Sequence, residues 1–165
     1  MSEFDLELLS GEHDRAGFRC GRESLDRYLR ETARGHLKKG VSVTRVLVER
    51  RARAPKKLLG YFTLTTIQVE AADWPGAAKG LPRMPVPAVL LGRLGVAEED
   101  QGRGIARLLL AAAREIAFAS MQGTGGIGMA VDAADEDVVS FYEKYGFKRV
   151  ADGSLRLFLP VASLI

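Results

Sequence analysis

Two glycines flank an arginine in the segment QGRGIA, residues 101–106, directly before a long apolar stretch. Apolar residues recur there at helical spacing, so the glycines precede the first turn of a predicted helix. Backbone N–H groups at a helix N-terminus lack internal partners and attract anions, and glycine lets a ligand touch the main chain. Arg103 and Arg107 can add positive charge. The segment predicts a phosphate-binding turn, although a tight turn without a ligand also accounts for two glycines.

Tyr142 has a side chain that suits a leaving group, because a phenol with a pKa of about 10 can donate a proton or a hydrogen bond. It shares a predicted helical stripe with Val138, Phe141 and Tyr145. Such a stripe is also typical of a helix face that packs in the core. We expect Phe141 and Tyr145 to be core residues, and the residues alone leave both roles open for Tyr142.

The chain has one cysteine, Cys20, and two histidines, His13 and His36. It therefore cannot form an intrachain disulfide, and a metal site built from cysteines or histidines is not expected. We interpret Cys20 as a small buried thiol and not as a nucleophile. The acids at 98–100 are expected to be a solvated loop, and no side chain is identified as a general base.

Two motifs resemble those of the GCN5-related N-acetyltransferases (GNAT). QGRGIA, Gln101–Ala106, is similar to their Q/R-x-x-G-x-G/A pyrophosphate loop, and VSFYEKYGF, 139–147, resembles their A-x-x-F-Y-x-x-x-G-F segment. The resemblance implies an α/β fold with a mixed sheet of about six or seven strands, about four helices and two splayed parallel strands at the cofactor site. It implies acetyl-CoA as cosubstrate, no metal, and Tyr142 as general acid.

The resemblance also implies which residues bind the cofactor. Backbone groups of Leu94 and Val96 would hold the pantetheine arm, and the 101–107 turn would wrap the pyrophosphate. Core packing is the alternative for the two side chains. The full implied set is Leu94, Gly95, Val96, Gln101, Gly102, Arg103, Gly104, Ile105, Ala106 and Arg107.

A narrower resemblance covers nearly the whole chain. The segments FRCGRESLDRYL (18–29), GYFTLT (60–65), LPRMPVPAVLLGRLGV (81–96) and FYEKYGF (141–147) are similar to toxins of bacterial type II toxin–antitoxin pairs that acetylate aminoacyl-tRNA. Gly95 and Ala106 depart from that pattern but are both small. This resemblance implies translation inhibition, a homodimer and an antitoxin with a ribbon–helix–helix part. The alternatives are an acetyltransferase of a small-molecule or peptide amine, and a non-catalytic CoA- or partner-binding regulator.

Basic residues are concentrated in one part of the chain. Between residues 19 and 57 there are thirteen Lys or Arg and four acids, whereas from residue 58 onward there are ten and twelve. A solvated helix face is one interpretation, and a surface for tRNA phosphates is the other. The predicted RNA-binding residues are Arg30, Arg34, Lys38, Lys39, Arg45, Arg83 and Arg93, with His36 also at the surface or facing RNA.

Length and composition set the frame for these motifs. The chain has 165 residues, 47% of them hydrophobic, which predicts one domain over 1–165. No apolar run is long enough to cross a bilayer, and the first residues are acidic where a signal peptide is basic. We therefore expect a cytoplasmic protein.

The motifs need secondary structure to position them. The pattern predicts the order α, β, β, β, α, β, α, β, β. Ser24 is a candidate N-cap for the first helix, Asp135 caps the last helix and Gly146 ends it. The expected stripe on the second helix is Ile105, Leu108, Leu109, Ala112 and Ile116. The predicted segments are a helix at 23–37, a hairpin of strands 42–50 and 58–70, a loop at 71–87, a buried strand at 88–96, a helix from 105, a strand at 127–133, a helix at 135–146 and a strand pair within 147–161 around Asp152 and Gly153.

Overall fold

The computed structural model describes residues 3–70, 72, 74, 80 and 84–164. Seven strands hydrogen-bond in the order β1-β3-β5-β6-β7-β9-β8, and four α-helices accompany them in the described chain. The mixed seven-stranded sheet with four helices confirms the predicted fold class. By its contacts the chain forms two compact units: the first unit is Met1–Leu64 with Arg93–Ala113, and the second is Thr65–Gly92 with Arg114–Ile165.

The first unit is built on antiparallel strands. Strand β3 (Val43–Glu49) pairs with β1 (Phe4–Leu8) on one edge and with β5 (Gly60–Val69) on the other. The β3–β5 pair is the hairpin that alternating β-branched residues predict. A second, two-stranded parallel sheet joins β2 (His13–Asp14) to β4 (Lys56–Lys57).

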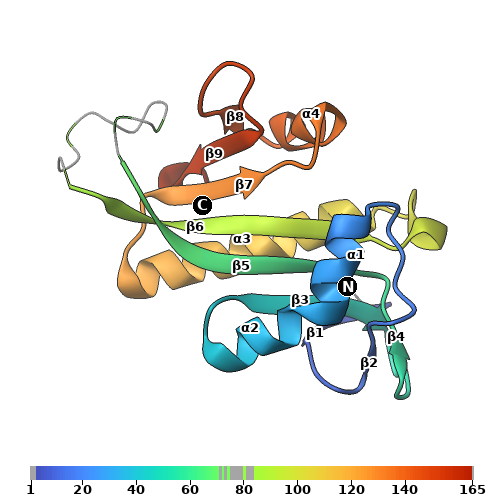
Figure 1. The fold of residues 1–165 in the computed structure, drawn as a ribbon. Coiled ribbons are helices and arrows are strands. Elements are labelled where there is room, and N and C mark those ends of the chain that lie inside the picture. The colour runs from blue at the N-terminus through green and yellow to red at the C-terminus, as the bar shows by residue number, and fades with distance from the viewer. Residues whose placement is uncertain (1–2, 71, 73, 75–79, 81–83, 165) are drawn as a thin grey trace. The chain divides into compact units, whose positions relative to one another are not determined.

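Helices α1 (Glu23–Glu31) and α2 (Ala33–Lys39) pack on this sheet (Figure 1). Tyr28, Leu29 and Ala33 are buried in one cluster with sheet residues that include Val46 and Tyr61. The first unit also contains the end of strand β6 (Val86–Val96), the short 3-10 helix η2 (Glu98–Asp100) and the first half of helix α3 (Ile105–Thr124). The glycine turn therefore lies between η2 and α3.

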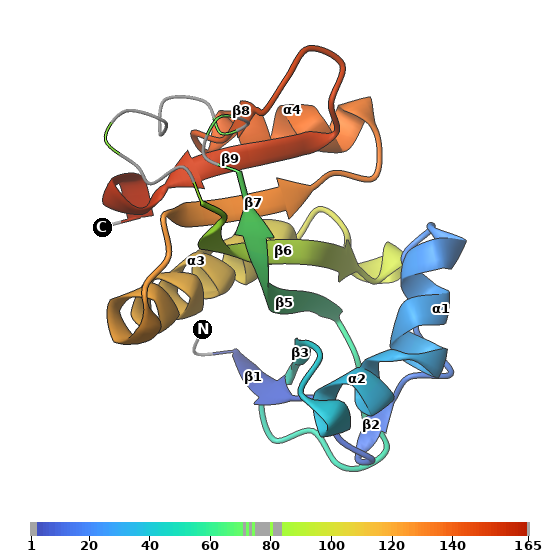
Figure 2. The same ribbon diagram turned by 60° about the vertical axis from the view of Figure 1, so that its left-hand side comes forward.

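The second unit contains the parallel pair of the sheet. Strand β6 pairs with β7 (Gly128–Asp132) in parallel from Val89–Met129 to Leu91–Val131. Strand β7 then pairs antiparallel with β9 (Arg156–Pro160), and β9 with β8 (Lys148–Arg149), as Figure 2 shows. Helix α4 (Glu136–Lys144) follows β7, and a last 3-10 helix, η3 (Val161–Leu164), follows β9. No helix in the described part of the chain is long and apolar enough to span a membrane.

Several local predictions are confirmed. Asp135 is the N-cap of α4, since its carboxylate accepts a hydrogen bond from the Val138 N–H at 3.1 Å. Gly146 follows the helix with φ of 95°, the left-handed conformation that ends helices. The closing strands β8 and β9 flank Asp152 and Gly153 as expected.

Other predictions are wrong in detail. Ser24 is not an N-cap, because α1 begins at Glu23, one residue before it. The residue at the N-cap position is Arg22, whose side chain makes no capping hydrogen bond. The predicted helix at 23–37 is two helices, which meet at the non-helical backbone of Thr32. On α3, Ile105 and Leu109 are buried as expected, but the other predicted stripe residues are half-buried; the buried side is completed by Leu110, Ala113, Ala117 and Met121.

The predicted order lacks three strands, namely β1 of the main sheet and the short strands β2 and β4 of the second sheet. Strand β1 precedes α1, and its sequence FDLEL alternates apolar and acidic residues. Alternation of this kind suits an edge strand with one face toward the core, and the ring of Phe4 is buried there. The predicted loop at 71–87 lies mostly outside the described residues, as does Arg83.

Candidate active site

The glycine turn of the first unit exposes backbone. Gly102 and Gly104 have φ of 87° and 78°, and a Cβ added at either position would meet open space. Glycine is favoured here by the left-handed conformation and not by crowding inside the protein. Helix α3 starts at Ile105, so its first free N–H groups directly follow the turn. The turn can accept a phosphate against bare main chain, as the pyrophosphate prediction requires.

The end of strand β6 leads into this turn. The Leu94 and Val96 side chains are half-buried, whereas Gly95 is buried. A side chain at Gly95 would place its Cβ 3.4 Å from the Cys20 sulfur. Strand β6 continues to Val96 beyond its parallel register with β7, which includes Leu91. Backbone groups of Leu94 and Val96 thus remain the candidates for the pantetheine arm.

Of the two arginines at the turn, Arg103 is already paired with acidic side chains of the protein. Arg103 donates to the Asp100 carboxylate at 2.8 Å and lies 3.6 Å from that of Glu49. Its guanidinium also sits over the Phe4 ring, 5.3 Å from the centroid. The hydrogen bond to Asp100 raises the pKa of Arg103. Arg103 therefore anchors the turn, while Arg107, on the first turn of α3, is exposed.

Asp100 corrects the prediction of a solvated acidic loop. Glu98 and Glu99 are exposed as expected, but Asp100 is buried and 6% exposed. One of its oxygens accepts the Arg103 hydrogen bond, and the other lies 3.5 Å from the Lys57 ammonium. Burial of a carboxylate requires paired charge, which these two cations supply.

Gln101 turns its side chain toward the protein. Its amide nitrogen donates to the carbonyl oxygens of Cys20 and Val96, each at 3.1 Å. The two hydrogens of one amide group are thus directed at two different segments. The Gln101 backbone stays available at the turn, where the resemblance implies pyrophosphate contact.

The predicted RNA-binding residues within the described chain all belong to the first unit. Arg30 on α1 pairs with Glu23 and Glu31, each at 3.3 Å. Lys38 and Lys39 are exposed in the last turn of α2. Half-buried positions are held by Arg34 on α2, Arg45 on β3 and Arg93 on β6.

Arg93 and Arg45 are less free to meet a ligand than the exposed residues of this set, because one is stacked and the other is partly buried. The Arg93 guanidinium stacks over the Tyr28 ring, 3.6 Å from its centroid, in a cation–π contact. Tyr28 in turn places its hydroxyl 3.1 Å from the Nδ1 of His36, which is half-buried. Partial burial lowers the pKa of Arg45. Arg34, Lys38 and Lys39 are the members of the set best placed to meet a large polyanion.

Tyr142 lies in an aromatic cluster of the second unit. Its ring is 2% exposed and makes edge contacts with Phe141 and Phe147, at centroid distances of 5.3 and 5.7 Å. Burial, followed by the negative charge of Asp132, raises the pKa of Tyr142 above its ordinary value. The phenol therefore keeps its proton at neutral pH. Phe141 and Tyr145 are half-buried, so they are less deeply packed than a core role predicts.

Cys20 is a buried thiol, as predicted. Burial, with a further contribution from Asp26, raises the pKa of its thiol to about 12. A thiol that holds its proton is a poor nucleophile. His13, which the sequence left without a role, is buried and its Nε2 lies 2.8 Å from Glu7. In the described residues no group of three or more His, Cys, Asp or Glu side chains could hold a metal ion.

Residues 43–149 match the family model described as "Acetyltransferase (GNAT) domain". The chain is 32% identical over 154 residues to a tRNA-acetylating toxin of Mycobacterium tuberculosis, an alignment that covers 92% of this chain and 88% of the toxin.

Two solved structures are similar over nearly the whole chain. One is AtaT complexed with acetyl-methionyl-tRNAfMet, with 28% identity, a TM-score of 0.89, and coverage of 98% of this chain and 97% of that one. The other is a tyrosine-to-phenylalanine mutant of the AtaT toxin bound to the C-terminus of the antitoxin AtaR and acetyl-CoA. It has 25% identity, a TM-score of 0.82, and coverage of 98% and 96%.

Proposed function

This chain belongs to the family of acetyltransferase (GNAT) domains, and we propose that it is a toxin that transfers the acetyl group of acetyl-CoA to the amino group of aminoacyl-tRNA. The observation that carries this proposal is likeness over almost the full length to a tRNA-acetylating toxin, at 32% identity. Acetylation of that amino group removes the nucleophile that peptide-bond formation needs. The product would therefore stop translation.

The glycine turn is the proposed binding site for the pyrophosphate of acetyl-CoA. The open space at Gly102 and Gly104 and the start of α3 fit a phosphate against backbone N–H groups. Backbone groups of Leu94, Gly95 and Val96 would bind the pantetheine arm. The remaining proposed contacts come from Gln101, Arg103, Ile105, Ala106 and Arg107.

Tyr142 is the proposed general acid. In acetyl transfer an amine nitrogen bonds to the acetyl carbon and the carbon–sulfur bond breaks, so the nitrogen loses a proton and the sulfur gains one. A thiol has a pKa near 8.5 and a phenol near 10, so full transfer from tyrosine to a thiolate is uphill. Burial raises the pKa of Tyr142 further, so it would act mainly by a hydrogen bond that stabilises the leaving sulfur. Solvent would supply the proton that restores the neutral thiol.

The basic residues of the first unit are the proposed contacts for tRNA. Arg34, Lys38 and Lys39 would bind phosphates electrostatically. Arg30, Arg45, Arg83 and Arg93 complete the proposed set. Contacts of this kind hold the tRNA in place without reading its sequence.

The proposed partners follow from the toxin function. A relative binds the C-terminus of its antitoxin, and we infer an antitoxin with a ribbon–helix–helix DNA-binding part for this chain too. We further propose one GNAT domain over residues 1–165, a homodimer, a reaction that needs no metal, and a location in the cytoplasm, where charged tRNA is used.

The direct test is acetyl transfer from carbon-14 acetyl-CoA to a charged tRNA pool. Uncharged tRNA, free amino acids, small amines and peptides serve as parallel acceptors. We expect label on aminoacyl-tRNA and its release as an acetyl-amino acid after mild alkaline hydrolysis of the ester. Preferred labelling of amines or peptides would support the alternative acetyltransferase, and CoA binding without transfer to any acceptor would support a regulator.

A further inference from the structure

The Gln101 side chain connects the cofactor turn to the end of strand β6, five residues earlier, and to the segment before helix α1, which is 81 residues away in sequence. Gln101 itself opens the cofactor turn, Val96 ends strand β6, and Cys20 lies just before helix α1. One amide group donates to the carbonyls of both Val96 and Cys20, at 3.1 Å in each case. Because both amide hydrogens are engaged, a displacement of the turn must move or break these bonds.

A second set of contacts brings the same segments together. The Glu98 N–H, in the 3-10 helix before the turn, donates to the Arg19 carbonyl at 2.8 Å. Cys20 also packs close to β6, because a Cβ at Gly95 would lie in van der Waals contact with the Cys20 sulfur, at 3.4 Å. The residues at 19–20 are therefore held against the strand and the turn that we propose for acetyl-CoA.

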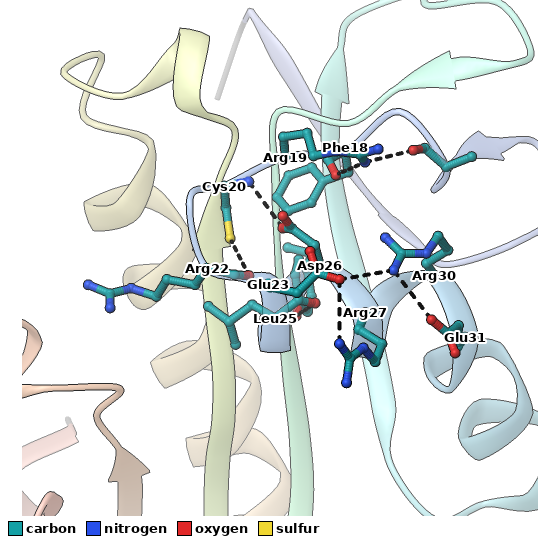
Figure 3. A network of polar contacts seen from close by, with 12 residues as sticks. Phe18, Arg19, Cys20, Arg22, Glu23, Leu25, Asp26, Arg27, Arg30 and Glu31 are labelled. Atoms are coloured by element: carbon teal, nitrogen blue, oxygen red, sulfur yellow. Dashed lines mark hydrogen bonds and ion pairs between the residues drawn. The ribbon is translucent and has the colours of Figure 1, made fainter.

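The held segment sets the start of helix α1 (Figure 3). The Cys20 N–H donates to the buried Asp26 carboxylate at 3.0 Å, and the N–H groups of Leu25 and Asp26 both reach the Arg22 carbonyl at 3.1 Å. The Tyr61 hydroxyl donates to the Leu25 carbonyl at 2.7 Å. Because α1 has no side-chain N-cap, these contacts fix its first turn.

We propose that Gln101 is a positioning residue that couples occupancy of the cofactor turn to helix α1, and through α1 to the basic helix α2. This inference rests on the proposed acetyl-CoA site and names a device within it. A ligand that orders the turn would order Gln101, which would then order residues 19–26 and the helices that carry Arg30 and Arg34. Coupling of this kind is reciprocal, so bound tRNA would in turn favour acetyl-CoA.

The test is hydrogen–deuterium exchange of the full chain with and without CoA. In the wild type we expect CoA to slow exchange both in peptides of the turn, 97–108, and in peptides that cover 19–27. Gln101→Met keeps the length of the side chain and removes both donors, so the turn should stay protected while protection of 19–27 disappears. Gln101→Arg, which restores N–H donors, should recover it. Gln122→Met, at an exposed glutamine of α3, is the matched control and should behave as wild type.

Kinetics supply a second readout. We expect Gln101→Met to raise the KM for aminoacyl-tRNA about 5- to 20-fold, a typical coupling, and to raise the Kd for CoA by a smaller factor, because the proposed contact of Gln101 with CoA is made by its backbone. A purely structural role would lower the melting temperature but leave the response of 19–27 to CoA intact, and that result would overturn the coupling. Absence of CoA protection at the turn in the wild type would instead overturn the proposed cofactor site itself.

Discussion

The two units of this chain contribute to the proposed reaction in different ways. The first unit offers bare backbone at Gly102 and Gly104 and a set of basic side chains on α1 and α2. The second unit offers one hydroxyl, that of Tyr142, inside an aromatic cluster. Binding in the first unit is thus spread over many main-chain and charged groups, whereas the second unit depends on a single atom. The difference predicts which substitutions remove activity and which only weaken binding.

The largest expected effect belongs to the single atom. Tyr142→Phe keeps the ring and its packing but removes the hydroxyl that would hydrogen-bond the leaving sulfur, so we expect kcat to fall by about 10²- to 10³-fold. The Kd for CoA should stay within about twofold, as isothermal titration calorimetry can check. Tyr145→Phe, on the residue that caps the same helix, is the matched control and should retain activity.

The same pair tests the role of the toxin in cells. Induction of the wild type or of Tyr145→Phe should arrest growth, and Tyr142→Phe should be tolerated. If Tyr142→Phe melts at a lower temperature yet acetylates normally, the tyrosine is a core residue and the contrast between the units disappears.

A smaller effect is expected at the backbone site of the first unit. Gly104→Val forces a β-branched residue into the left-handed conformation, at a cost of about 1–2 kcal/mol in stability, and fills the space reserved for phosphate. We expect the affinity for CoA to fall about 10- to 100-fold, equivalent to about 1.4–2.7 kcal/mol.

Gly153→Val is the control for the strain. Gly153 has φ of 75° and open space around it, in the turn between β8 and β9 of the second unit. The two variants should lose similar stability, and only Gly104→Val should lose CoA binding. Equal CoA affinities in the two folded variants would remove the pyrophosphate assignment.

The basic helices should respond more weakly, and through salt. Reversal of Arg34, Lys38 and Lys39 to glutamate should raise the KM for aminoacyl-tRNA about tenfold and reduce the salt slope by about 0.7–0.9 for each phosphate that is no longer neutralised. CoA affinity should not change. Lys148→Glu, at an exposed lysine of the second unit, should leave the slope as it is. If the triple variant has the KM of the wild type and the activity of the wild type does not depend on salt, these residues form a solvated helix face that does not bind tRNA.

The smallest effect concerns the buried thiol of the first unit. The pKa of Cys20 rises from 9.0 to about 12, so the folded state holds a proton that the unfolded state releases above pH 9. A raised folded pKa gives stability that is complete below the unfolded pKa and is lost as pH rises. Between pH 7 and pH 9.5 the wild type should therefore lose about 0.8 kcal/mol more unfolding free energy than Cys20→Ala.

Urea denaturation at the two pH values measures this difference, and the constant packing defect of the variant cancels. Equal pH dependence in the two proteins would show that the thiol titrates normally and is not shielded. In that case the Cys20 thiol would not be shielded from water, unlike the buried phenol of Tyr142.

Sequence patterns predicted most of the fold because its elements carry strong local signals. The β3–β5 hairpin alternates β-branched residues, the 88–96 strand is apolar through most of its length, and Asp135 and Gly146 mark both ends of α4. Strand β1 was not predicted, because its alternate acidic residues resemble an acidic terminal segment. The break between α1 and α2 at Thr32 was not predicted, because the helical spacing of apolar residues continues through it.

The candidate site was predictable in its residues but not in its contacts. Gly102, Gly104 and Tyr142 are visible in local motifs. The contacts of Gln101 with Cys20, and of Arg93 with Tyr28, join residues that are 81 and 65 positions apart, and no local pattern encodes them. Asp100 was misjudged for the same reason, since its burial depends on Lys57, which is supplied from a different strand.

The single tryptophan of the chain lies in the second unit. Trp74 is 3% exposed and its ring contacts that of Phe158 at a centroid distance of 3.7 Å. Intrinsic fluorescence excited at the red edge of indole absorption will therefore report on the core around Phe158 alone. The first unit contributes to far-ultraviolet circular dichroism but not to that emission. A pair of denaturation curves, one from each signal, will coincide only if the whole chain unfolds in a single cooperative step.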